Sequence, residues 1–369
     1  MGLHPGRRRQ LVRSVLRQRR GLGWRSLGSR VLAPRHEPHR PPRRPAALVM
    51  SAIDTHAHLF FETLLGSVGD LGPFLTRDAA GIATLTTGGF DYVLGKIPGL
   101  DRTAEQRLDE LDKAGIEVQV VSASPLWYFS HTPAEVASRF ASRYNELLSE
   151  WTSADPARLK ALALLPVSDV GAAVTELERA VRDLNVVGAV IGTDAAEDLD
   201  HPDLDDLYAA CSDLDVPLFI HSVVPGIDGP DGDPRLRRWL RDVTIGYPFE
   251  ETIATTSLLL GGVLRRHSEL DICISHGGGA VPFLLGRVRA WVATGAAPVD
   301  LADFDEGYNR LWFDVHVHSD KSADLLIETA NPERLVLGTN FGGWDSSSPA
   351  QVERLPIDMG ANARRLLRL

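Results

Sequence analysis

Short apolar segments alternate with longer segments of helical periodicity from Met50 to the C-terminus. The apolar segments are almost continuous in Val, Ile, Leu and Ala, which is typical of parallel strands covered on both faces. Between them, apolar residues recur every three or four positions, as Leu108 and Leu111 do, and this spacing predicts amphipathic helices. The predicted strands are Ala52–Leu59, 118–124, 159–166, 186–193, 216–223, 270–277, 311–318 and 334–341. The predicted helices are Ala104–Ala114, 133–151, 170–184, 204–214 and 250–267.

This alternation predicts an α/β fold, a (β/α)8 TIM barrel of the metal-dependent hydrolase type. Eight parallel strands joined by right-handed helical crossovers fit the pattern, and a doubly wound open sheet is the alternative. Residues with catalytic potential follow the first, fifth, sixth and eighth predicted strands. The carboxyl ends of all strands meet at one mouth of a closed barrel, so this distribution favours closure.

We assign the barrel domain to residues 50–369. Two segments do not follow its alternating pattern, one within the domain and one before it. Residues 60–101 form an insertion between the first two strands, rich in Gly, Thr and Asp, that either shapes a substrate pocket or decorates an edge. Residues 1–49 contain thirteen arginines and one acidic residue, Glu37. We interpret them as a disordered or non-native extension, with a transit peptide or a polyanion-binding segment as alternatives.

Composition narrows the class of protein. Of 369 residues, 44% are hydrophobic and 24% charged, as in soluble globular proteins, and no stretch approaches the roughly 20 apolar residues of a membrane helix. The net charge is −10, and the body is more acidic still because the first 49 residues are basic, so we expect no nucleic-acid partner. Cys211 and Cys273 lie in apolar surroundings and predict reduced core thiols in a cytoplasmic protein.

Four histidines stand at the ends of predicted strands. His56 and His58 belong to the first strand, His221 ends the apolar part of the fifth, and His276 follows the sixth and precedes three glycines. Alternate residues of a strand point to the same side, so His56 and His58 can bind one ion. Several imidazoles with one open position are typical of a catalytic site for a zinc-like metal.

Longer motifs surround these histidines. They are Ile53-Asp54-Thr55-His56-Ala57-His58, Phe219-Ile220-His221, Gly246-Tyr247-Pro248-Phe249-Glu250-Glu251-Thr252, and His276-Gly277-Gly278-Gly279 continuing to Gly286-Arg287. In this order the sequence resembles the amidohydrolase-related, metal-dependent decarboxylases, and the likeness spans essentially residues 51–369.

The resemblance implies a homodimeric barrel enzyme with one divalent metal ion, usually zinc. It implies that His56, His58 and His221 are metal ligands and that His276 is the acid–base catalyst beside them. Arg287 matches an arginine that reaches a substrate carboxylate in the neighbouring subunit. The implied reaction is non-oxidative decarboxylation of an unsaturated or aromatic carboxylic acid.

Two departures from the family pattern affect the predicted site. The family's eighth strand ends in an aspartate that binds the metal, whereas this chain has Asn340, an amide that can still offer a neutral oxygen. We predict Asn340 as a ligand or substrate contact, with Asp345 as a possible replacement. The family's substrate-binding arginine after the first strand has no clear counterpart here.

His316 and His318 form a second pair of alternate histidines, beside Asp314. Only His318 matches the family pattern, and there it is not a ligand, so the sequence favours a single metal. We therefore predict a carbon–carbon lyase that acts on a small carboxylate, without a membrane partner. A hydrolase or hydratase of the same superfamily is the alternative, and a non-catalytic relative is a further one, motivated by Asn340.

Overall fold

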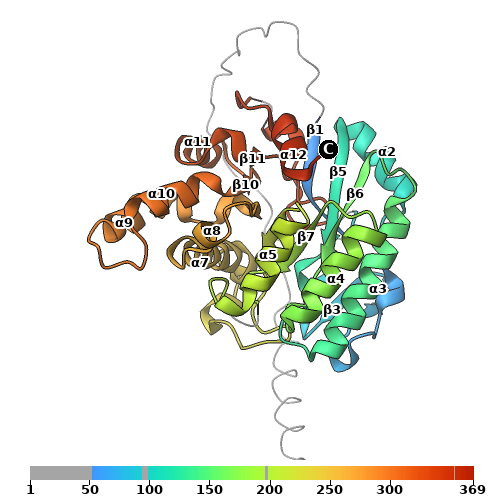
Figure 1. The fold of residues 1–369 in the computed structure, drawn as a ribbon. Coiled ribbons are helices and arrows are strands. Elements are labelled where there is room, and N and C mark those ends of the chain that lie inside the picture. The colour runs from blue at the N-terminus through green and yellow to red at the C-terminus, as the bar shows by residue number, and fades with distance from the viewer. Residues whose placement is uncertain (1–51, 94–98, 196–197, 353) are drawn as a thin grey trace, which may run out of the picture. The chain divides into compact units, whose positions relative to one another are not determined.

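Eight parallel strands form a nearly closed barrel in the computed structural model, which describes residues 52–93, 99–195, 198–352 and 354–369 (Figure 1). Each predicted strand overlaps one of them, and each strand pairs in parallel with the next. Parallel bridges from Asp54 to Leu337 and from Ala57 to Phe341 link the first and last strands. In barrel order the strands are β1 (Ala52–Leu59), β5 (Ile116–Ala123), β6 (Leu159–Leu164), β7 (Gly188–Gly192), β8 (Leu218–His221), β9 (Ile272–Ile274), β10 (Trp312–Asp314) and β11 (Leu335–Val336).

Helices connect the strands and cover the barrel. Several begin at a side chain that accepts a backbone N–H of the first turn, such as Thr103 before α2 and Asp169 before α4. The main helices are α2 (Ala104–Ala114), α3 (Ala134–Thr152), α4 (Val170–Asp183), α5 (Asp205–Asp213), α7 (Gly246–Leu260), α9 (Val281–Val292), α10 (Leu301–Arg310), α11 (Asp320–Thr329) and α12 (Met359–Leu367). The short helices α6 (Arg241–Thr244) and α8 (Val263–Arg266) accompany α7.

The predicted continuous helix over 250–267 is wrong at its C-terminal end. The structure has two helices there, α7 and α8, separated by Gly261 and Gly262. Gly262 has φ 69°, a left-handed conformation that a continuous α-helix does not contain. The apolar periodicity persists across this break, which explains why the pattern alone suggested one helix.

The segment 60–101, described except for residues 94–98, contains a small antiparallel sheet. Its strands are β2 (Phe74–Arg77), β3 (Ala83–Thr87) and β4 (Phe90–Val93). Residues 88–90 of this segment and residues 224–227 of the loop after β8 line the same small pocket. Because β8 ends at His221, the segment lies near the carboxyl ends of the barrel strands.

Residues 1–49 lie outside the described residues. Within the part of the chain that is described, no helix is both long enough and apolar enough to cross a membrane.

Candidate metal centre and active site

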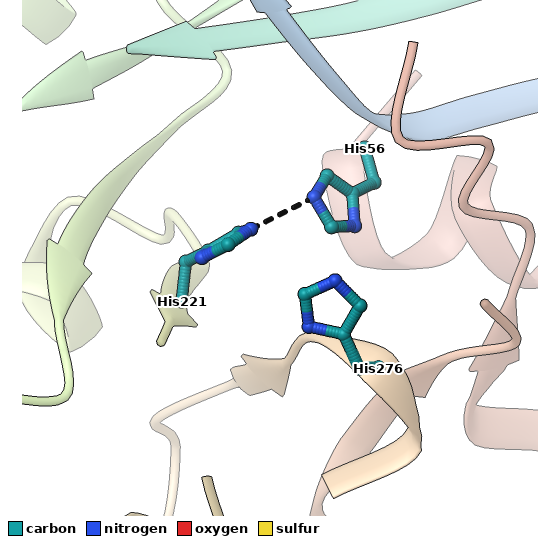
Figure 2. A group of neighbouring side chains, drawn as sticks. All are labelled: His56, His221 and His276. Atoms are coloured by element: carbon teal, nitrogen blue, oxygen red, sulfur yellow. Dashed lines mark hydrogen bonds between the residues drawn. The ribbon is translucent and has the colours of Figure 1, made fainter. Parts of the chain in front are cut away.

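The four predicted site histidines converge at the carboxyl ends of the barrel strands. His56 and His58 are buried residues of β1, and His221 is the buried last residue of β8. His276 follows β9 by two residues, and its side chain is only 12% exposed. Figure 2 shows the rings of His56, His221 and His276 facing one another from three separate segments. The ligand nitrogens of these three residues all lie within 4.8 Å of one another.

Each of the three predicted histidine ligands has its Nδ1 atom next to a hydrogen-bond acceptor. His56 Nδ1 lies 2.6 Å from Asp314 Oδ2, His58 Nδ1 lies 3.0 Å from the Ala123 carbonyl oxygen, and His221 Nδ1 lies 2.6 Å from the Ser222 carbonyl oxygen. A carbonyl or carboxylate oxygen can only accept, so each Nδ1 carries the proton. The Nε2 atom of each neutral ring is therefore left with a free lone pair.

These Nε2 atoms point at one another. His56 Nε2 lies 3.2 Å from His58 Nε2 and 3.0 Å from His221 Nε2. Burial lowers the pKa of all three rings below the ordinary value, that of His221 to about 4, and the neighbouring histidines lower them further. Facing lone pairs repel, whereas ligands about 2.1 Å from one shared ion lie about 3.0–3.4 Å apart. The donor set therefore fits a divalent cation.

Asn340 stands beside this centre in an unusual environment. Its backbone is left-handed at φ 50°, and its Nδ2 donates to Asp345 Oδ1 at 2.6 Å. Its Oδ1 is buried and has no hydrogen-bond partner. A buried unpaired amide oxygen is costly unless it meets a ligand or a cation. Asp345 was the predicted replacement for the family's metal-binding aspartate. Its carboxylate instead accepts from Asn340 Nδ2 and lies 2.7 Å from His318 Nε2.

Glu251 is the main site residue that sequence reasoning did not single out. It projects from α7, is fully buried, and its Oε1 lies 2.5 Å from His276 Nδ1. Ser222 and Ser275 donate to the same oxygen at 2.9 and 2.6 Å, which favours the carboxylate form. Burial opposes this and raises the pKa of Glu251 to about 8, while burial lowers the pKa of His276 to about 4. The contact fixes the ring of His276 through Nδ1 and leaves its Nε2 free for the metal centre.

A buried polar network supports β1 from behind the histidines. Arg107 donates to the His58 carbonyl oxygen at 3.1 Å and to Gln119 Oε1 at 2.7 Å. Gln119 in turn donates to Asp54, which also accepts the backbone N–H of His56 at 3.2 Å. These hydrogen bonds hold the backbone of β1, which carries His56 and His58, although the buried Nε of Arg107 has no partner.

The three glycines after His276 serve packing. At Gly279, where φ is +66°, an added Cβ would lie 2.1 Å from the carbonyl oxygen of Pro248 on α7. Only glycine permits this approach of the loop to α7, the helix that carries Glu251.

A cavity of about 410 Å³ opens beside His276. Its lining includes Tyr247, Phe283, His316, His318 and Asp345. Arg287, the predicted substrate-binding residue, lies on the exposed side of α9. The structure thus brings His56, His58, His221 and His276 together, ties Asn340 to Asp345, and leaves Arg287 on the surface.

A barrel with a group of histidines able to hold a metal ion at the carboxyl ends of its strands is typical of one class, the metal-dependent hydrolase type. The amidohydrolase family matches residues 53–369, and this chain belongs to that family. The predicted resemblance and fold class are confirmed.

Related proteins are decarboxylases. The chain is 27% identical over 242 residues to 2-amino-3-carboxymuconate-6-semialdehyde decarboxylase of Dictyostelium discoideum, covering 64% of this chain but only 65% of that protein. It is 27% identical over 290 residues to gamma-resorcylate decarboxylase of a Rhizobium species, covering 72% of this chain and 87% of that protein. A 2-keto-4-carboxy-3-hexenedioate hydratase of a Sphingobium species is 28% identical over 56% of this chain and 60% of its own length. The relatives support an enzyme of the carboxy-lyase class.

Solved structures share the fold. The 5-carboxyvanillate decarboxylase of Sphingomonas paucimobilis has a TM-score of 0.72 at 23% identity and covers 87% of this chain and 99% of its own. A Polaromonas dihydroxybenzoic acid decarboxylase with bound manganese and the inhibitor 2-nitroresorcinol has a TM-score of 0.65 at 20% identity, covering 86% and 97%. The manganese belongs to that neighbour; for this chain the divalent ion and its identity as zinc stay predictions.

Proposed function

We propose that this chain is a metal-dependent, non-oxidative decarboxylase of an unsaturated or aromatic carboxylic acid. The observation that carries the proposal is the convergence of three lone-pair-bearing Nε2 atoms, from His56, His58 and His221, beside a histidine oriented by a carboxylate. The decarboxylases among the relatives support the same reaction class.

The three histidines would hold the ion, and the unpartnered Asn340 Oδ1 atom would offer it a further neutral oxygen. A bound divalent cation would polarise a substrate oxygen or a water molecule. The protein's own acid–base group is His276, whose Nε2 would donate a proton to the carboxyl-bearing carbon. The bond from that carbon to the carboxylate then breaks, its electron pair returns to the substrate π system, and carbon dioxide leaves. Glu251 keeps the ring of His276 in position through Nδ1.

Zinc is the ion that we propose, because imidazole nitrogens suit it and three of them leave a coordination position open for water or substrate. Manganese is the competing ion, in view of the solved neighbour that contains it. Metal analysis of purified protein distinguishes the two ions. We also place the protein in the cytoplasm, since both described cysteines, Cys211 and Cys273, are free and buried.

We further propose a homodimer in which Arg287 contacts the substrate carboxylate in the partner's site. The apolar surface around Arg287 supports this arrangement. Phe283 on α9 is 78% exposed and Phe249 on α7 is 54% exposed, and such exposed aromatic patches mark interaction surfaces. An arginine fork binds a carboxylate with two parallel hydrogen bonds, which lysine does not reproduce.

Mixed dimers test the role of Arg287. When inactive Arg287→Ala and His276→Ala chains are mixed, each mixed dimer regains one complete site, so activity should reappear. A mixture of His276→Ala and His221→Ala chains is the control. Each substitution damages the site of the chain that carries it, so both sites of the mixed dimer are defective and no activity should return. Absence of recovery in the first mixture, despite confirmed subunit exchange, would place Arg287 outside the catalytic site.

A hydratase is the second candidate function, favoured by the hydratase among the relatives. Both reactions use a polarised oxygen and a proton donor, but only decarboxylation releases carbon dioxide. Incubation of metal-loaded protein with a panel of aromatic and unsaturated carboxylates, with carbon dioxide measured directly, tests the proposal. Substrate loss with a gain of water and no carbon dioxide would establish the hydratase instead.

A further inference from the structure

A second cluster of metal-ligating side chains lies next to the histidine centre. His316, His318 and Asp345 offer ligand atoms that all lie within 4.8 Å of one another. Asp345 Oδ2 is 2.7 Å from His318 Nε2 and 3.4 Å from His316 Nε2. The 3.4 Å separation is that of two ligands of one ion at about 2.1 Å each, whereas the 2.7 Å contact is a hydrogen bond that a bound ion would replace.

The unpartnered Nε2 atom of His316 is an independent observation that favours a cation at this cluster. Its side chain is fully buried, and its Nδ1 lies 3.2 Å from the Ser347 hydroxyl oxygen. Its Nε2 is buried too, makes no hydrogen bond, and is directed at the Asp345 carboxylate from 3.4 Å. A buried ring nitrogen without a partner costs free energy that a bound cation would recover.

The cluster is adjacent to the first centre and separate from it. The His316 ring centroid lies 5.5 Å from that of His276 and 6.0 Å from that of His56. Asp314 connects the two groups, because its Oδ2 faces His56 Nδ1 and its Oδ1 accepts the backbone N–H of His316. Asn340 connects them as well through its Nδ2 contact with Asp345.

We infer that His316, His318 and Asp345 form a second divalent-cation site at the mouth of the barrel. Two imidazoles and one carboxylate are a ligand set for transition-metal ions such as Zn²⁺, Mn²⁺ and Fe²⁺, and they leave coordination positions open. The sequence favoured a single metal because only His318 matches the family pattern, where it is not a ligand. The structure places His316 and Asp345 next to His318, which completes a set of three ligands.

The electrostatics of the cluster suit a cation. Burial would raise the pKa of Asp345, but the contacts from His316 and His318 outweigh it and hold that pKa well below its usual range. The Oδ1 atom of Asp345 stays engaged with Asn340, so Oδ2 is the oxygen directed at both rings.

A cation at this site would also supply a positive charge to the cavity beside His276. Among the described residues, none of those that line the cavity beside His276 is a lysine or an arginine, while His316, His318 and Asp345 all line it. An ion there would give this chain a positive charge facing an anionic ligand. Only this consequence rests on the proposed decarboxylase function, since the cation site itself follows from the ligand geometry.

The test is metal stoichiometry with Mn²⁺ as the probe, measured on full-length apoprotein by equilibrium dialysis with elemental analysis. We expect two equivalents per wild-type chain and one equivalent in His318→Ala, whose half-exposed side chain makes the variant compatible with folding. His316→Gln should also bind one equivalent. His201→Ala, a surface substitution outside both clusters, is the matched control and should keep two.

The complementary variant His56→Ala should lose the other ion and keep one. Two Mn²⁺ ions in neighbouring sites are expected to couple magnetically, so electron paramagnetic resonance of the wild type should change to an isolated-ion spectrum in His318→Ala. A single equivalent in wild type at saturating Mn²⁺, or two equivalents retained in both His318→Ala and His316→Gln, would overturn the inference. These readouts do not involve turnover, so the second site and the decarboxylase proposal can fail separately.

Discussion

Asp314→Asn isolates the contribution of a residue that touches a metal ligand but not the metal. Asp314 Oδ2 lies 2.6 Å from His56 Nδ1, and both side chains are almost completely buried. Asparagine has nearly the same shape and retains one acceptor oxygen, but it removes the negative charge that makes the His56 ring a stronger donor to a cation. Charge-assisted hydrogen bonds are about twice as strong as neutral ones, so the orientation of the ring is weakened as well.

Loss of such an outer partner typically weakens metal binding about 10- to 100-fold, which corresponds to about 1.4 to 2.8 kcal/mol. Competition between the protein and a fluorescent chelator, at less than one equivalent of Zn²⁺, measures the tighter site. Asp271→Asn is the matched control. Asp271 is also a partly buried carboxylate, and it accepts hydrogen bonds from Trp312 and Arg334. It lies just before β9, at the opposite end of that strand from His276, so its substitution should leave the metal affinity unchanged. Equal Zn²⁺ affinity in wild type and Asp314→Asn would refute the assignment of His56 as an oriented ligand.

The remaining predictions concern the groups around the ion. His56→Ala should lose the tightly held metal and all turnover, because few protein bonds hold the ion, and full occupancy by elemental analysis would contradict this. His276→Ala should keep the metal while kcat falls on the order of 10²–10⁴-fold, since it removes the proton donor. Glu251→Gln should lower kcat with little change in KM or metal content, because the amide replaces the 2.5 Å contact that orients the His276 ring with a weaker one; unchanged kcat would separate Glu251 from the mechanism. Asn340→Asp should tighten metal binding and lower the melting temperature of the metal-free protein, because it places a second carboxylate about where Nδ2 now lies, 2.6 Å from Asp345; unchanged values by chelator competition and calorimetry would place Asn340 outside the metal's reach.

The barrel was predictable because its strands are nearly uniform in apolar residues. All eight barrel strands overlap predicted segments, and α2 has the predicted bounds Ala104–Ala114, whereas the small sheet of β2, β3 and β4 was not predicted. Helices after β9, such as α9 and α11, were not predicted. In α9 the aromatic residues Phe283 and Trp291 are exposed, so its apolar residues are not confined to one buried face. Periodicity identifies a helix only where one face is apolar and the other is polar.

The site was predictable where ligands end strands, because strand ends of a parallel barrel converge whatever their separation in sequence. Glu251 was harder to assign, since it lies mid-helix and pairs with His276, 25 residues later. The direction of a single helical side chain toward a ring is a property of tertiary packing. The same holds for His316, whose unpartnered Nε2 becomes visible only when Asp345 and Ser347 are placed around it.

The most direct test of the central claim is carbon dioxide release by one preparation of the protein in three states: metal-loaded, stripped by a chelator, and reloaded with Zn²⁺ or Mn²⁺. Each state is incubated with the same panel of aromatic and unsaturated carboxylic acids. The account predicts release equal to the acid consumed in the loaded state, loss of release on stripping, and its return on reloading. Release that persists in fully stripped protein, or acid consumed without carbon dioxide in the loaded state, would contradict it.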